Sequence, residues 1–399
     1  MSNRELFHAT MRRENGEQLL HYELGYNART LGKWYEQGLP RDILVPELFG
    51  VAQTPDLFDY MNVCKFAMCQ FEQYYVPPFQ SEIIEKRRIS TIIRDGRGNT
   101  MEHRTDGQGS LPRGINFAIK THADYLERRS RITGKAEVRA TEQYLDGVSR
   151  NIRHQQDHIV GLWVHGPFAF LRELLGVEGA MTAPYYEPEM VRMMLDDHLL
   201  VAKEAGARII DAVKPDCSYV WEDCSGSTGP FISPPIFREF CIPWYQRWKG
   251  FLLDMGVPWI VMDTDGNPTP LVGLWMEGGV DCILPWEVNA VDILKIAEDF
   301  PELNLMGGVY KHIFEPESLS QVGRFKTKDA RQEIDAELER VVKPLRKRGG
   351  YVVGLDHCVH RGVGYTDFAY YCRQLSEHYG KANQATRFGG NLCETGGES

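Results

Sequence analysis

Short apolar segments alternate with longer segments of helical spacing from about residue 156 onward. The apolar segments read HIVGLWVHG, CSYVWE, WIVMD, DCILP, LNLMGG and YVVGL. The helical segments between them span about residues 188–207, 233–255, 269–277, 291–300 and 329–348. Strands and helices alternate in this way when helical crossovers join neighbouring parallel strands. The sequence therefore predicts an α/β fold with a parallel sheet.

Two architectures contain such a sheet. Six strand–helix units fit a closed (β/α)8 TIM barrel whose remaining strands come from the N-terminal half of the chain. The alternative is a doubly wound open sheet, in which a glycine-rich phosphate turn normally follows the first strand. The sequence contains neither GxGxxG nor GxxxxGK[ST]. We therefore expect residues 1–399 to form a single TIM-barrel domain.

Residues 1–130 have a less regular pattern, which predicts an N-terminal extension of the barrel. Within it, residues 89–104 read as two strands joined by the turn Asp95-Gly96-Arg97-Gly98-Asn99. Glycine and asparagine supply the positive φ angles that a tight hairpin turn requires. We expect this β-hairpin to be an insertion that lies outside the barrel, near its catalytic mouth.

Charge and hydropathy exclude several classes of protein. The formal net charge is −10, and no cluster of Lys and Arg stands out, which argues against a nucleic-acid partner. No apolar run approaches the ~20 residues of a membrane span, and the first 15 residues are polar and charged. We expect a cytoplasmic protein. Its nine cysteines include no CxxC pair, so most should be free thiols.

Ionisable and polar residues follow most of the predicted strands. In a (β/α) barrel, the residues just past the carboxyl ends of the strands form the active site. The candidate residues at these positions are His165, Glu222, Asp263, Asp265, Asn267, Trp286, Lys311, His357 and Cys358. Asp263 and Asp265 are two positions apart at a strand end, so both carboxylates can face one point. Such a pair can share a proton or bind a cation, although capping of the helix near Pro268 would explain one of them.

Asp356-His357-Cys358 follows the last predicted strand. Histidine and cysteine are both zinc ligands, and histidine is the usual proton carrier near neutral pH. A loop histidine that bonds to the backbone is the alternative interpretation. Glu222 follows the strand CSYVW and is a further candidate metal ligand.

Several of these segments resemble the uroporphyrinogen decarboxylase superfamily. The similar segments are INFAIKTHADY, WEDCSGSTGPFISPPIFREFCIPWYQRW, MDTDGN, GGV and GGYVVGLDHCVH, and together the resemblance covers about two thirds of the chain. The resemblance implies a (β/α)8 barrel. The haem-pathway decarboxylases of the superfamily carry a basic segment similar to FMRQAGRY. The nearest residues here read LLHYELGYNARTLGKW, while His357 matches a histidine in the last strand loop of those enzymes.

A second branch of the superfamily comprises zinc methyltransferases that act with corrinoid proteins. Their metal is bound by a His-x-Cys pair and by a cysteine in the last loop. Asp263-Thr264-Asp265 occupies the His-x-Cys position, and Cys358 matches the last cysteine. The resemblance thus implies one matching thiolate ligand, with two carboxylates in place of the other two ligands. It also implies relatedness to proteins that demethylate methyl ethers or amines.

These observations lead to one preferred function and two alternatives. The preferred function is metal-assisted transfer of a methyl group from a small O- or N-methyl compound to a cobalamin carried by a corrinoid protein. The predicted catalytic residues are Asp265, His357 and Asp263. The predicted substrate-binding residues are His165, Asn267, Trp286 and Lys311. The predicted zinc ligands are Glu222, Asp263, Asp265, His357 and Cys358. The alternatives are a cofactor-independent decarboxylase with Asp/His acid–base chemistry, and a non-catalytic barrel that binds a tetrapyrrole or corrinoid. The sequence leaves a homodimer open.

Overall fold

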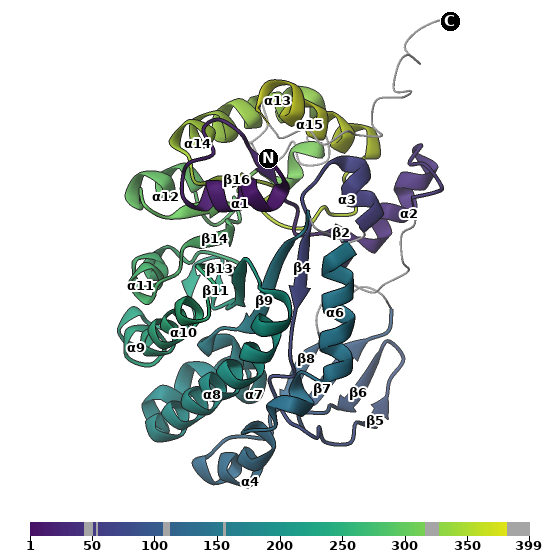
Figure 1. The fold of residues 1–399 in the computed structure, drawn as a ribbon. Coiled ribbons are helices and arrows are strands. Elements are labelled where there is room, and N and C mark those ends of the chain that lie inside the picture. The colour runs from purple at the N-terminus through teal and green to yellow at the C-terminus, as the bar shows by residue number, and fades with distance from the viewer. Residues whose placement is uncertain (44–50, 53–54, 107–111, 155–156, 316–326, 381–399) are drawn as a thin grey trace, which may run out of the picture. The chain divides into compact units, whose positions relative to one another are not determined.

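The computed structural model describes the chain except for residues 44–50, 53–54, 107–111, 155–156, 316–326 and 381–399 (Figure 1). Its contacts divide the chain into two compact units. The first unit comprises Met1–Lys65, Pro285–Val288 and Asp292–Ser399. The second unit comprises Phe66–Leu284 and Asn289–Val291.

The second unit is built on parallel strands. β4 (Phe66–Cys69) pairs with β9 (Ile159–His165), β9 pairs with β10 (Cys217–Trp221), and β10 pairs with β13 (Trp259–Thr264), all in parallel. β14 (Cys282–Pro285) follows β13 in the strand order. The predicted strands that end near His165, Trp221, Met262 and Leu284 are therefore confirmed as strands. β4 comes from the N-terminal half of the chain, as the prediction of additional strands required.

Helices lie between these strands, and α8 to α11 fall within or close to the predicted segments. They are α6 (Glu142–His154), α7 (Pro167–Tyr186), α8 (Pro188–Val213), α9 (Pro234–Phe240), α10 (Ile242–Asp254) and α11 (Val272–Gly278). In Figure 1, α8 and α10 lie to one side of the strands, and α8 contacts β9. The segment predicted as one helix over residues 233–255 is two helices, α9 and α10, and Cys241 lies between them as the last cap of α9 and the first cap of α10.

An antiparallel sheet also belongs to the second unit. Its order is β5 (Glu82–Lys86), β6 (Ser90–Arg94), β7 (Thr100–Arg104) and β8 (Arg113–Asn116). The predicted hairpin is the pair β6–β7, which is antiparallel in the register Ser90↔Arg104 to Arg94↔Thr100. Its turn is closed by Asp95, whose Oδ1 accepts hydrogen bonds from the backbone N–H groups of Arg97 and Asn99. The hairpin prediction is confirmed, and β5 and β8 extend the hairpin into a larger sheet.

The first unit contains its own parallel strands. β1 (Leu20–His21) pairs with β16 (Tyr351–Val353), which also pairs with β15 (Asn304–Met306), again in parallel. The helices of this unit are α1 (Asn3–Met11), α2 (Ala28–Glu36), α3 (Pro55–Met61), α12 (Ile293–Asp299), α13 (Ala330–Glu337), α14 (Lys343–Arg348) and α15 (Tyr365–His378). A π-helical segment, Leu338–Val342, joins α13 to α14, so the helix predicted over residues 329–348 is continuous but not uniform.

Aromatic side chains form much of the buried core of the first unit. Tyr26, Trp34, Phe368 and Tyr371 are all fully buried. The ring centroids of Trp34 and Phe368 are 5.2 Å apart, and those of Tyr26 and Phe368 are 5.7 Å apart. These contacts hold α2 and α15 against β2 (Tyr26–Asn27), because large rings bury much apolar area per residue.

The structure thus has the α/β class and the parallel strand pairs that the sequence predicts. Closure of the strands into a barrel, and a single domain over residues 1–399, stay predictions.

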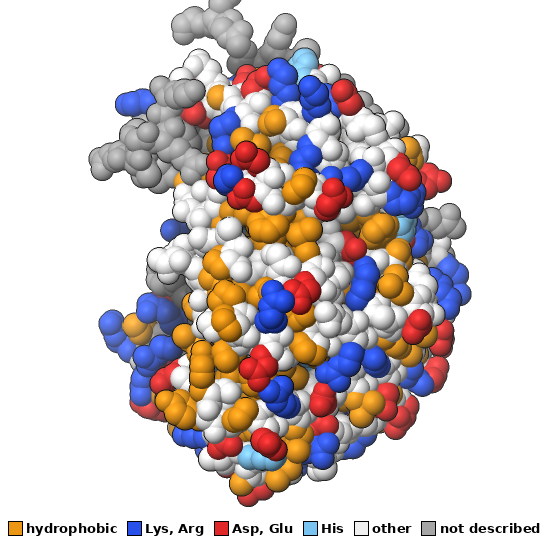
Figure 2. Space-filling view, turned by 90° about the vertical axis from the view of Figure 1, so that its left-hand side faces the viewer, with side chains coloured by type: hydrophobic (Ala, Val, Ile, Leu, Met, Phe, Trp, Pro, Cys, Tyr) orange, Lys and Arg blue, Asp and Glu red, His pale blue; other side chains and the backbone are white. Residues whose placement is uncertain are grey.

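Within the described residues, no helix combines the length and apolar character that crossing a membrane would require. On the face drawn in Figure 2, acidic and basic side chains are interspersed, so that face carries no field of a single sign.

Candidate active site

The strand ends of the second unit place several predicted residues on one sheet face. His165 is in register with Trp221, and Trp221 is in register with Asp263. Residues in register on parallel strands point to the same side of a sheet, and so do residues two positions apart. Trp163 and Tyr219 therefore share this face. We call these five residues, Trp163, His165, Tyr219, Trp221 and Asp263, the strand-end face.

Rings surround the imidazole of His165. Its centroid lies 4.5 Å from that of Trp163, 5.1 Å from that of Trp221 and 5.2 Å from that of Tyr74. Burial lowers the pKa of His165 well below its usual range, and the nearby His198 acts in the same direction. His165 is therefore neutral near pH 7, so it can act as a hydrogen-bond donor or acceptor toward a ligand but carries no charge.

Asp263 is half-buried at the end of β13, where the hydroxyl of Tyr219 donates a hydrogen bond to its Oδ2 over 2.8 Å. Asp265, also half-buried, follows two residues later. Gly266, the next residue, has φ +75°, and a Cβ there would lie 2.6 Å from the carbonyl oxygen of Gly226. Only glycine fits at this position, because any side chain would collide with the backbone of Gly226. The segment Asp263–Asp265 therefore lies close to the loop after β10.

Asn267 has a local role in the structure. Its Oδ1 accepts a hydrogen bond from the backbone N–H of Thr269 at 3.2 Å, where the 3-10 turn Thr269–Leu271 begins. Its own N–H donates to the carbonyl of Gly226. Asn267 therefore makes a capping contact at this turn, and its predicted binding of substrate stays a prediction.

A cavity of about 370 Å³ lies beside His165 in the second unit. It is lined by the segment that follows β4, by two residues of the strand-end face and by the region around α6: Gln70, Phe71, Glu72, Gln73, Tyr74, Arg139, Thr141, Tyr144, Trp163 and His165. Four of these residues carry large aromatic side chains. Its volume lies within the usual range for small-molecule sites, roughly 300–1,000 Å³.

Three polar atoms of this lining are buried and unpaired. Among the described residues, Gln73 Nε2, Tyr74 Oη and His165 Nδ1 have no hydrogen-bond partner. By contrast, Gln73 Oε1 accepts a hydrogen bond of 2.8 Å from the backbone N–H of His165, which fixes the orientation of the amide. Buried polar groups in folded proteins are normally satisfied. These three atoms are themselves buried, although their residues line the cavity.

The hairpin tip lines a second cavity, of about 280 Å³, which shares Glu72 and Tyr74 with the first. Asp95, Gly96 and Arg97 contribute to its wall. The guanidinium carbon of Arg97 lies 5.3 Å from the ring centroid of Tyr74, and Arg97 also pairs with Glu173. The tip thus lies next to the cavity that contains His165, which agrees with the expected place of the hairpin near the strand ends.

Glu222 is fully buried, and both of its carboxylate oxygens accept hydrogen bonds. The backbone N–H of Phe168 donates to Oε1 at 2.9 Å, and the hydroxyl of Tyr245 donates to Oε2 at 2.6 Å. Burial raises the pKa of Glu222 to about 8, against the opposing effect of both hydrogen bonds. A Cβ at Gly166 would lie 1.3 Å from Oε2, so the carboxylate packs directly on the N-terminal end of α7. This environment gives Glu222 a structural function, and metal binding by Glu222 stays a prediction.

In the first unit, Asp356 connects the loops that follow three strands. Its Oδ1 accepts a hydrogen bond from the backbone N–H of Lys311 at 2.8 Å, and its Oδ2 accepts one from Val288 at 2.9 Å. The Lys311 ammonium group pairs with Glu287 at 3.2 Å. Trp286 is fully buried, and its Nε1 has no hydrogen-bond partner among the described residues. Substrate binding by Lys311 and Trp286 stays a prediction.

His357 and Cys358 lie in the loop after β16 of the first unit. His357 is half-buried, whereas Cys358 is buried and carries a free thiol. Asp263, Asp265 and Glu222 belong to the second unit. Convergence of these side chains on one cavity, and a metal held among them, stay predictions.

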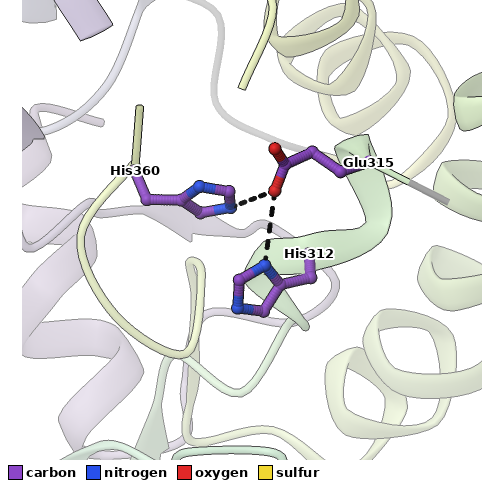
Figure 3. Close-up of side chains that lie close together, drawn as sticks. All are labelled: His312, Glu315 and His360. Atoms are coloured by element: carbon purple, nitrogen blue, oxygen red, sulfur yellow. Dashed lines mark hydrogen bonds and ion pairs between the residues drawn. The ribbon is translucent and has the colours of Figure 1, made fainter. Parts of the chain in front are cut away.

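Sequence reasoning missed a cluster of two histidines and a glutamate in the first unit. His312, Glu315 and His360 place three possible ligand atoms within 4.8 Å of one another, and Figure 3 shows the Glu315 carboxylate between the two rings. The His312-x-x-Glu315 spacing was visible in the sequence and could have drawn attention to this segment. The pairing with His360 was not visible, because His360 lies in the loop after β16 and approaches Glu315 only through the fold.

Comparisons with known proteins show a similarity of fold. No protein-family model matches the sequence, and no curated protein matches it. Among solved structures, the chain is similar to a methyltransferase from Methanosarcina mazei, with a TM-score of 0.60 and 13% sequence identity. The match covers 95% of this chain and 99% of that chain. At this identity the likeness shows a shared fold, and the superfamily resemblance seen in the sequence stays a prediction.

Proposed function

We propose that this chain is a methyltransferase that moves a methyl group from a small O- or N-methyl compound to a cobalamin carried by a corrinoid protein. The fold that it shares with the methyltransferase from Methanosarcina mazei supports the reaction class. A shared fold is only a prior for function, because one fold hosts many reactions. The assignment of a reaction to this chain therefore depends on its site.

The cavity beside His165 is the observation that carries the proposal. It lies at the carboxyl ends of β4 and β9, where parallel α/β folds bind their ligands. Its aromatic walls suit the apolar part of a small methyl donor. The side chains of Gln73, Tyr74 and His165 add polar groups to these walls. A small-molecule substrate fits these properties better than a macromolecular one.

The chemistry requires help at the leaving atom. Cob(I)alamin on the partner protein would supply the electron pair for the new bond to the methyl carbon. The bond between that carbon and the donor oxygen or nitrogen would break, and the leaving atom would keep its electron pair and take up a proton. A proton or a cation at the leaving atom lowers the barrier to this step. We assign that role to Asp265 and His357, and Asp263 is the third proposed catalytic residue. Asp263 is oriented by Tyr219, which supports a defined geometry for this carboxylate.

A zinc ion would supply the same assistance as a Lewis acid. Asp263, Asp265, His357 and Cys358 offer the oxygen, nitrogen and sulfur atoms that zinc binds in proteins. Glu222 fits this set least well, because both of its oxygens already accept hydrogen bonds from Phe168 and Tyr245. We therefore propose the four other residues as the metal ligands.

Methyl transfer to free cobalamin tests the proposal. The purified protein would be mixed with reduced cobalamin and with separate O-methyl and N-methyl donors, and methylation of the cobalt would be followed by visible absorption. We expect donor-dependent methylation that saturates with donor concentration. Release of carbon dioxide from a carboxylated compound, with no methylation from any donor, would instead support the decarboxylase alternative.

A further inference from the structure

The cluster of His312, Glu315 and His360 lies at the strand ends of the first unit. His312 belongs to the 3-10 turn Lys311–Phe314, which comes after β15, and Glu315 directly follows this turn. His360 lies in the loop after β16, and β15 pairs in parallel with β16. All three side chains are half-buried. Side chains at the carboxyl ends of neighbouring parallel strands are well placed to form a functional site.

The separations of Glu315 from the two histidines resemble those between metal ligands. Glu315 Oε2 lies 3.5 Å from His312 Nδ1 and 3.5 Å from His360 Nε2 (Figure 3). Ordinary N–H···O hydrogen bonds are about 2.7–3.2 Å long. Ligand atoms about 2.0–2.1 Å from a tetrahedral zinc ion are roughly 3.3 Å apart. The two contacts of Glu315 are therefore closer to the spacing of ligands than to that of hydrogen bonds.

Backbone groups contact both His360 and Glu315 in the structure. The backbone N–H of Gly362 donates to His360 Nδ1 at 3.1 Å, and His360 Nε2 lies 3.0 Å from the carbonyl oxygen of Lys311. A Cβ at Gly362 would lie 1.6 Å from Glu315 Oε1, so the carboxylate packs on the glycine backbone. When Nε2 binds a cation, Nδ1 carries the proton, so the bond from Gly362 must be given up. The Lys311 carbonyl then becomes available as a further oxygen ligand.

We propose that His312, Glu315 and His360 form a binding site for a divalent transition metal ion such as Zn²⁺ or Co²⁺. Two imidazoles and one carboxylate suit ions of this class better than Mg²⁺ or Ca²⁺, which prefer oxygen ligands. Three protein ligands leave at least one position for water or another small ligand. This site is separate from the zinc ligands proposed above and does not depend on the methyl-transfer reaction.

Cobalt titration tests this site directly. Protein without a histidine tag would be stripped with chelator and titrated with Co²⁺, and binding would be followed by visible absorption. We expect His312→Ala and His360→Ala to weaken binding at this site by more than about 100-fold, because even changes beyond the ligands themselves cost about 10–100-fold. Gly362→Ala should also weaken binding, because the new methyl group displaces the Glu315 carboxylate. His378→Ala, an exposed histidine on α15, is the matched control and should bind as the wild type does.

Cys358→Ser separates this site from the other proposed metal site. A cobalt spectrum that retains its intensity in Cys358→Ser and loses it in His360→Ala supports the proposal. A spectrum that is lost in Cys358→Ser but unchanged in His312→Ala and His360→Ala would overturn it. Failure of the wild-type protein to bind Co²⁺ would overturn it as well. Circular dichroism of each variant shows whether a loss of binding reflects a loss of folding.

Discussion

The hydroxyl group of Tyr219 donates a 2.8 Å hydrogen bond to Oδ2 of Asp263, from one parallel strand to its neighbour. Tyr219 is in register with Val261, so Asp263 lies two residues further toward the end of β13. The bond holds a half-buried carboxylate on the same sheet face as His165. The orientation of a predicted catalytic residue therefore depends on a side chain of the adjacent strand.

Removal of this hydroxyl should reduce activity more than stability. A hydrogen bond to a charged group contributes about 1.5–3 kcal/mol, so we expect Tyr219→Phe to lower the methyl-transfer rate by about 10- to 100-fold. Steady-state kinetics with cobalamin as acceptor measures this effect. Tyr186→Phe, at an exposed position of α7, is the matched control. An unchanged rate in Tyr219→Phe would show that the orientation of Asp263 does not matter for turnover.

Arg97 at the hairpin tip should affect substrate binding. Its guanidinium group lies over the ring of Tyr74, which lines both cavities. Such a contact contributes about 0.5–2 kcal/mol, so we expect Arg97→Ala to raise KM about 2- to 30-fold with little change in kcat. Arg94→Ala, which removes an exposed ion pair with Glu82 in the same sheet, is the control. A fall in kcat at constant KM would contradict this role of the hairpin tip.

Glu222 should make stability depend on pH. Its pKa is about 8 in the folded protein, above the ordinary value, so the folded state binds more protons than the unfolded state between about pH 4.5 and 8. Stability therefore falls as the pH rises through this window, by up to about 1.4 kcal/mol per pH unit from this group. Urea denaturation at several pH values should show that Glu222→Gln loses this dependence. Parallel pH profiles for the variant and the wild type would contradict the assignment.

The fold was predictable where strands are long and buried. β9, β10 and β13 are almost wholly buried, and their apolar runs are clear in the sequence. β1 has only two residues, which is too short to show a period. β5 and β8 are fully exposed, so their side chains do not alternate between apolar and polar, and only the hairpin between them was recognised. Burial of one face is what gives a strand its pattern.

Only some residues of the candidate site could be predicted from the sequence. His165 and Asp263 end strands with strong apolar patterns, and the structure places both on one sheet face. Gln73 and Tyr74 line the cavity beside His165 but follow β4, which was not recognised because it lies before the regular alternation of strands and helices begins. Glu222 also ends a clear strand, yet its hydrogen bonds depend on tertiary packing. Position at a strand end therefore indicates candidates but does not separate catalytic from structural carboxylates.

The methyl-transfer rate of Asp265→Ala bears most directly on the proposed function. Asp265 is half-buried just past β13, so its truncation should leave the thermal unfolding temperature nearly unchanged. Because an acid at the leaving atom contributes about 10²- to 10⁴-fold, we expect the rate to fall at least about 100-fold. Asp211→Ala, at an exposed position of α8, should retain the wild-type rate. Normal turnover by a folded Asp265→Ala variant would contradict the proposed function.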